Sequence, residues 1–126
     1  MKIELPILHQ VMKNGEVIST ETTEEFDLDT SVYSEERWEQ HFPGLAAREG
    51  LFEYIERIDK AKDVAQRVQV ASMLKAIFCF IESPTIKTYK DFAHLFNLAA
   101  PDYATRLINT LVESFKAILG ASSTKN

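Results

Sequence analysis

Apolar residues near the start of the chain recur at every second position, which is the period of a β-strand. They are Ile3, Leu5 and Ile7, and Val11 continues the alternation after His9. The dipeptide Asn14-Gly15 follows, and both of its residues tolerate the positive φ angles of a two-residue type I′ turn. Such a turn places Val11 opposite Ile18 on one face. We therefore predict a β-hairpin over residues 2–25. It must pack against helices or another chain, because two strands alone are marginally stable.

The rest of the chain repeats its apolar residues at spacings of three and four, which is typical of amphipathic helices. We predict about five helices, over residues 34–42, 45–58, 61–82, 88–98 and 101–119. Ser34 is expected to cap the first helix, Thr88 and Asp91 to form a capping box at the start of the fourth, and Gly120 to end the last. The helix over residues 61–82 is apolar on two faces, so it should be the central helix, buried on more than one side.

These elements predict one compact domain over residues 1–120, with residues 121–126 as a flexible tail. The fold class is α+β and mostly α-helical, with an N-terminal β-hairpin over residues 2–25 followed by a helical part over residues 34–119. A chain of 126 residues has room for one ordinary hydrophobic core.

The net charge of −5 is unevenly distributed. Residues 16–39 contain nine acids, with Arg37 as their lone base. Such a segment repels a phosphate backbone, so we expect no nucleic-acid partner. It can be a solvated acidic face, or a surface that meets a basic partner or keeps like subunits apart.

No group of residues predicts catalysis, a cofactor or a metal ion. The three histidines, His9, His41 and His94, lie in different predicted elements and never at metal-binding spacing. The lone cysteine, Cys79, falls between two phenylalanines, where a buried thiol has a raised pKa and is inert. No glycine-rich phosphate loop and no nucleophile–base pair is apparent. We expect a protein that is not an enzyme and takes no small-molecule substrate.

The N-terminus lacks the apolar core of a signal peptide, and the most apolar stretch, Val68–Ile81, is too short to cross a bilayer. We therefore expect no membrane partner and a location in the cytoplasm.

Two neighbouring segments carry a resemblance to a known family. Residues 34–43 read Ser-Glu-Glu-Arg-Trp-Glu-Gln-His-Phe-Pro, and residues 51–58 read Leu-Phe-Glu-Tyr-Ile-Glu-Arg-Ile. After an N-terminal hairpin, the chain thus has a short Ser-to-Trp-Glu helix, a Phe-Pro stop and an amphipathic Leu-Phe-x-Tyr helix. This order resembles that of the tail assembly chaperones of long, non-contractile-tailed phages and prophages of Gram-positive bacteria. The similarity covers about a fifth of the chain.

The resemblance implies a chaperone that binds the tape measure protein, keeps it soluble, and helps recruit tail-tube subunits, which are copies of the major tail protein. It also implies self-association, a location in the cytoplasm of the bacterial host, and absence from the mature virion. In physical terms, a client helix would need an apolar groove with a polar rim, and one apolar stripe of residues 64–81 is a candidate if it is exposed.

The candidate protein-binding residues lie in the segments that carry the resemblance. They are Trp38, Phe42, Leu51, Phe52, Tyr54, Ile55 and Ile58. Each of them can instead be a core residue that anchors one helix on another. Two other functions stay open. One is an acidic structural or adaptor subunit of a phage particle. The other is a DNA-binding regulator, because residues 88–98 and 101–119 superficially resemble a helix-turn-helix pair.

Overall fold

The computed structural model describes residues 1–61 and 64–122. It confirms the predicted fold class, an N-terminal antiparallel sheet followed by helices in a compact α+β arrangement. Residues 123–126 of the predicted tail lie outside the described residues. Gly120 does not end the last helix, which continues to Ser122.

The N-terminal hairpin consists of β1 (Lys2–Lys13) and β2 (Glu16–Leu28). The φ angles of Asn14 and Gly15 are 54° and 78°, as the predicted turn requires. The predicted pairing of Val11 with Ile18 is confirmed.

The hairpin extends three residues beyond its predicted end, because Phe26 and Leu28 are buried. A short third strand, β3 (Ile81–Glu82), was not predicted; it pairs with Asp27 and Leu28.

Six helices follow within the described residues. They are α1 (Tyr33–His41), α2 (Pro43–Ala46), α3 (Leu51–Lys60), α4 (Gln66–Phe78), α5 (Tyr89–Ala93) and α6 (Pro101–Ser122). The predicted cap of α5 is confirmed, since the Thr88 hydroxyl accepts a hydrogen bond from the Asp91 amide. The predicted start of α6 at Pro101 is also confirmed. The other predicted bounds need correction.

Ser34 is not the N-cap of α1, because the helix already begins at Tyr33. The Ser34 hydroxyl is buried and donates to the Ser31 carbonyl at 2.8 Å, so it closes the turn that precedes the helix.

The helix predicted over residues 45–58 is two helices, because the chain leaves the helical path between Ala47 and Gly50. The helix predicted over residues 61–82 is shorter at both ends. Its described part begins at Gln66 and ends at Phe78, where the chain turns into β3; its predicted residues 62–63 lie outside the described residues.

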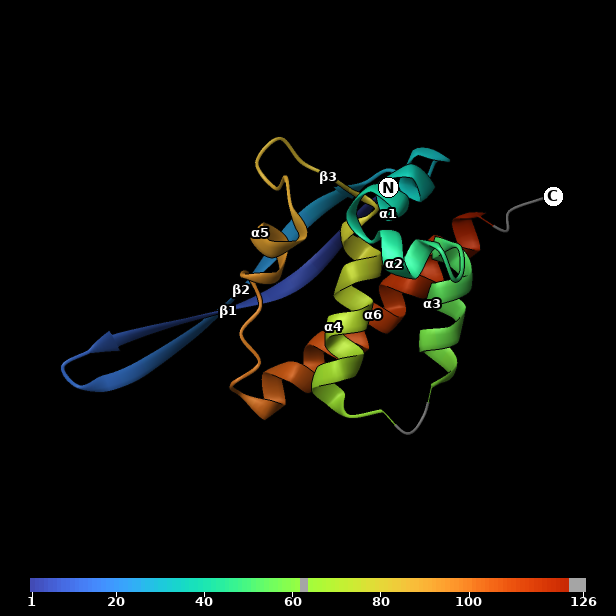
Figure 1. Cartoon of the computed structure of the whole chain (residues 1–126). Coiled ribbons are helices and arrows are strands. Elements are labelled where there is room, and N and C mark those ends of the chain that lie inside the picture. Colours follow the sequence, from blue (N-terminus) through green and yellow to red (C-terminus); the bar gives the residue numbers. More distant parts are fainter. Residues whose placement is uncertain (62–63, 123–126) are drawn as a thin grey trace.

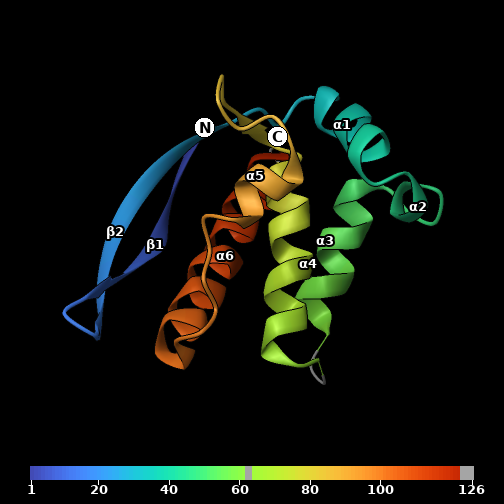
Figure 2. The same ribbon diagram turned by 60° about the vertical axis from the view of Figure 1, so that its left-hand side comes forward.

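The helices α3, α4 and α6 pack together, and α4 contacts both of the other two (Figures 1 and 2). α4 also contacts α5, which confirms that it is covered on more than one side. β1 lies next to α6, and the rings of Phe26 and Phe92 meet edge to face at 5.7 Å between β2 and α5. One continuous core therefore joins the helices to the first half of the hairpin. Among the described residues, every helix is too short or too polar to cross a membrane.

Candidate functional site

Five of the seven predicted protein-binding residues lie in the core. Trp38, Leu51, Tyr54, Ile55 and Ile58 are all buried. Phe42 and Phe52 are half-buried, and their rings meet those of Tyr89 and Phe80 at centroid distances of 5.4 Å and 5.7 Å. The structure thus places all seven in or against one hydrophobic core, and it does not present them as an exposed surface. That they bind a partner stays a prediction.

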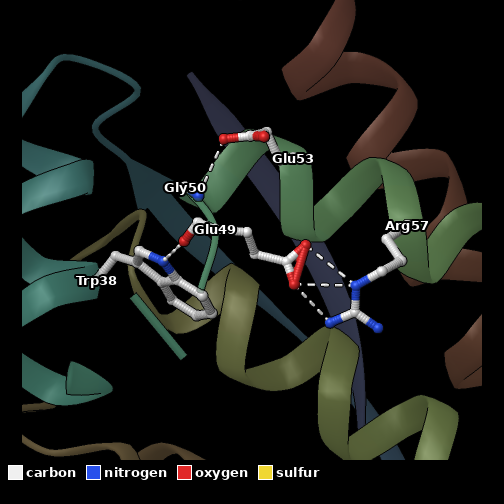
Figure 3. Close-up of polar contacts among 5 residues, drawn as sticks. All are labelled: Trp38, Glu49, Gly50, Glu53 and Arg57. Carbon is white, nitrogen blue, oxygen red and sulfur yellow. Dashed lines mark hydrogen bonds and ion pairs between the residues drawn. The ribbon is translucent and has the colours of Figure 1, made fainter. Parts of the chain in front are cut away.

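Polar contacts at the junction of α1 with α3 explain why the chain breaks between α2 and α3 (Figure 3). The Trp38 indole donates its N–H to the Glu49 carbonyl at 3.0 Å. The Glu49 carboxylate in turn accepts three hydrogen bonds from the Arg57 guanidinium, at 2.7–3.0 Å. The Arg57 guanidinium also lies over the Tyr54 ring, 5.2 Å from its centroid.

Two glutamates then satisfy the first amides of α3. The Glu53 carboxylate accepts from the Gly50 amide at 3.1 Å, and the Glu35 carboxylate of α1 accepts from the Leu51 amide at 2.9 Å. Glu35 is half-buried and joins α1 to α3. The acidic and aromatic residues that carry the resemblance therefore build a structural junction in this conformation.

The apolar stripe of residues 64–81 is mostly covered too. Val70, Met73, Leu74 and Ile77 are buried against neighbouring helices. Val64 and Val68 are 40% and 55% exposed, so the described part of this stripe reaches solvent near the start of α4.

A second exposed apolar site lies at the far end of the hairpin. Residues 9–20 are all exposed, and we call this segment the distal arm. Its turn lies well away from the helices (Figure 1). Four large apolar side chains reach solvent there: Val11 (57% exposed), Met12 (73%), Val17 (60%) and Ile18 (42%).

These four side chains form two cross-strand pairs on opposite faces. Val11 lies opposite Ile18, and Met12 lies opposite Val17. Residues directly opposite each other share a face, and successive residues alternate between faces, so each face of the distal arm carries one apolar pair. Exposed apolar groups gathered in this way mark an interaction site more than scattered ones do.

The root of the distal arm is held firmly to the helices. The Tyr103 hydroxyl of α6 donates to the Pro6 carbonyl at 2.7 Å. Arg106 of α6 forms an ion pair with Glu21, and the Asn97 side-chain amide donates to the Gln10 side chain at 2.7 Å. The arm therefore projects in a defined direction from a fixed base.

A buried thiol and a surface cleft are further features of the described residues. Burial raises the pKa of the Cys79 thiol to about 12, as predicted for an inert core thiol. A surface cleft of about 320 Å³ is lined by α1, β3 and the loop after it. Its Arg37 guanidinium donates to the carbonyls of Phe78 and Ile81, so it caps the end of α4.

His41 lies in the same cleft, where burial and then the Arg37 charge lower its pKa. Within the described residues, no three His, Cys, Asp or Glu side chains lie together so as to hold a metal ion.

Sequence reasoning predicted the Val11–Ile18 pair but did not predict that it is exposed. The signal available in the sequence is the length of the strand. The 12 residues of β1 span about 40 Å at the usual rise, which is longer than the part of the strand that the neighbouring helices cover. Comparison of the chain with protein-family models, with curated proteins and with solved structures gave no match.

Proposed function

We propose that this protein is a phage tail assembly chaperone, which holds the tape measure protein through the distal arm and keeps it soluble while tail-tube subunits are recruited. Two lines of support are independent of each other. The first is the order of residues over 34–43 and 51–58, which resembles that chaperone family. The second, which carries the proposal, is the exposed apolar end of the hairpin.

The distal arm is a better client surface than residues 34–58, because the apolar side chains of that segment are mostly buried in the core. Exposing residues such as Trp38 and Ile55 would open the core, at a cost of several kcal/mol. The distal arm already presents Val11 and Ile18 on one face and Met12 and Val17 on the other. An amphipathic client helix can cover either face without any change in the core.

The energetics favour many weak contacts along one long client. Burying one such side chain fully contributes about 1.5–3 kcal/mol, and these four are already partly covered. A single arm therefore binds weakly after the cost of association is subtracted. Several copies on one extended client gain through effective concentration, which suits a coat of chaperones on the tape measure protein.

Acidic residues around the arm's root suit the same role. Glu21, Glu24 and Glu25 lie on β2 outside the core. They place charge between the core and the distal arm, and such charge opposes the aggregation that exposed apolar residues otherwise promote.

The test is co-expression of a tape-measure fragment with the protein and with two matched double variants. The first, Val11→Thr with Ile18→Thr, removes an apolar pair from the distal arm but keeps β-branched side chains. The second, Val68→Thr with Val64→Thr, makes the same kind of change at side chains of nearly equal exposure elsewhere. We expect the soluble fraction of the fragment to fall several-fold with the first variant and to stay unchanged with the second.

Each contrary result has a distinct meaning. A fragment that is equally soluble without any chaperone overturns the proposed function. A loss confined to the Val64/Val68 variant moves the client site to the start of α4. Presence of the protein in purified virions contradicts a chaperone and supports the structural subunit instead.

A further inference from the structure

Among the described residues, the distal arm has two strand edges without a neighbouring strand. The hairpin register shows which residues point their backbone N–H and C=O groups outward at each edge. In a two-residue hairpin the residues that flank the turn, here Lys13 and Glu16, exchange both hydrogen bonds. Even-numbered residues of β1 therefore point their N–H and C=O groups away from β2. Pro6 occupies such an outward position, where its missing N–H costs nothing, and its carbonyl accepts the Tyr103 hydroxyl. The Leu8 backbone also hydrogen-bonds to the Tyr103 hydroxyl. Beyond these contacts, Gln10 and Met12 present outward backbone groups.

We infer that two copies of this chain pair through the β1 edges of their distal arms, residues 9–13, to form a four-stranded antiparallel sheet. The inference deepens the self-association expected under the proposed function, because it names the edge and the geometry. Unpaired strand edges are ready templates for another strand, and a two-stranded ribbon gains stability from more strands.

The helices of each copy, which we call the body, prevent β1 of one copy from pairing antiparallel with β2 of a second copy. That arrangement sets the hairpins side by side with both bodies at the same end, about 10 Å apart, which is two strand spacings. Each body contains three helices packed together, and each helix is about 10 Å across (Figure 2). The bodies would overlap, so antiparallel pairing must join like edges and place the bodies at opposite ends.

Charge then distinguishes β1 from β2. Glu16, Glu21, Glu24 and Glu25 lie along the free part of β2. In a β2 pairing centred on Thr20, Glu16 of one copy lies opposite Glu24 of the other, and opposed like charges are destabilising. Residues 9–13 of β1 contain one lysine and no acid.

The register that uses the whole free edge is centred on Val11. It sets Val11 opposite Val11 of the second copy, Gln10 opposite Met12, and Lys13 opposite His9. The outward groups of Gln10 and Met12 then form about four hydrogen bonds between the copies. The turn of each copy lies opposite Leu8 of the other, where the free edge ends at the Tyr103 hydroxyl.

Edge pairing leaves both faces of the sheet open for the client. One face gathers Val11 and Ile18 from both copies, and the other gathers Met12 and Val17 from both. The apolar surface available to a client helix is thereby doubled on each face.

A cysteine cross-link tests the register. In the proposed pair, the Cα atoms of the two Val11 residues are about 4.5 Å apart, within reach of a disulfide. Ile18 lies one strand further out, so two Ile18 residues are about 14 Å apart across three strand spacings. We expect Val11→Cys to form a disulfide dimer under mild oxidation at least tenfold faster than Ile18→Cys. The native Cys79 is buried and should not compete.

A proline pair tests the edge itself. Met12→Pro removes an outward N–H from β1, as the native Pro6 does, and should leave the hairpin intact. Val17→Pro does the same on the opposite β2 edge and also removes one apolar side chain from the same face. Sedimentation at increasing concentration should show dimers of the unmodified chain and of the Val17 variant, and at least a tenfold weaker dimer of the Met12 variant.

The two proposals fail separately. A chain that stays monomeric at all concentrations, or equal cross-linking at Val11 and Ile18, overturns the β1 pairing. Preferential cross-linking at Ile18 replaces it with pairing through β2. If the Met12→Pro variant is monomeric but still keeps the tape-measure fragment soluble, the pairing stands and the client binds single arms. A dimer that forms through β1 but protects no client overturns only the proposed function.

Discussion

The two halves of the hairpin share one backbone ladder but differ in what covers their side chains. In the proximal half, Leu5 and Ile7 of β1 have exposed fractions of 0% and 2%. Val11 lies on the same face of the same strand and is 57% exposed. The pairing with β2 is unbroken from Lys2 to Lys13. Backbone pairing thus gives the hairpin its shape, whereas burial against the helices decides which half stabilises the fold.

This difference separates two roles within one element. The proximal half shares the core with the helices, so changes there should alter the stability of the whole domain. The distal arm contributes little to that core, and its apolar residues are available to a partner. The Tyr103–Pro6 hydrogen bond lies where the two roles meet.

The largest expected effect contrasts Leu5→Ala with Val11→Ala. We expect Leu5→Ala to lower the free energy of unfolding by about 2–5 kcal/mol, because it leaves a cavity in a closed core. Val11→Ala should lower it by less than about 0.5 kcal/mol, as at other exposed positions. Denaturant titration of both variants measures the contrast, and similar losses would show that the distal arm is covered by the domain in solution.

The sequence predicted the features that depend on neighbouring residues alone. The Asn14-Gly15 turn, the pairing across it and the Thr88 cap all follow from local backbone preferences. The break between α2 and α3 was not predictable in this way. It depends on Glu35 and Trp38 of α1, which reach the chain near Glu49 and Leu51 only after folding.

The candidate site was harder to predict, for a physical reason. A helix face that packs in a core and one that binds a partner need the same apolar spacing, so Tyr54 and Ile58 fit both interpretations. The structure places them in the core. The alternation along β1 likewise looks the same at Leu5 and Val11, and their difference in exposure arises from where the helices end.

A middle-sized effect is expected where the two halves meet, at Tyr103. Loss of its hydroxyl in Tyr103→Phe should lower the free energy of unfolding by about 1 kcal/mol at neutral pH, because the Pro6 carbonyl loses its partner. Amide hydrogen exchange should also quicken along the distal arm. Faster exchange spread evenly over the whole domain would contradict a role at the arm's root.

The same residue predicts an alkaline loss of stability. Burial raises the pKa of Tyr103 to about 12 from its ordinary 10.0. The folded protein therefore holds this proton more tightly than the unfolded chain, so the contribution is complete below pH 10 and is lost as the pH rises toward 12. Tyr103→Phe should flatten this part of the stability profile. The raised pKa of Cys79 contributes a separate loss of stability that begins near pH 9. Cys79→Ala removes that second contribution, so it serves as the control.

The smallest effect on the whole domain is expected at the tip, from Gly15→Ala. A Cβ at Gly15 would meet no atom within 4 Å, so the change acts through its φ of 78°, which costs a residue other than glycine about 1 kcal/mol. We expect a several-fold rise in amide exchange within residues 9–20 and a change below about 0.5 kcal/mol in global unfolding. Asn14→Gly, which keeps the turn conformation accessible, should leave both values nearly unchanged. A global loss as large as the local one would mean that arm and body unfold together, and the two halves of the hairpin would then form one cooperative unit.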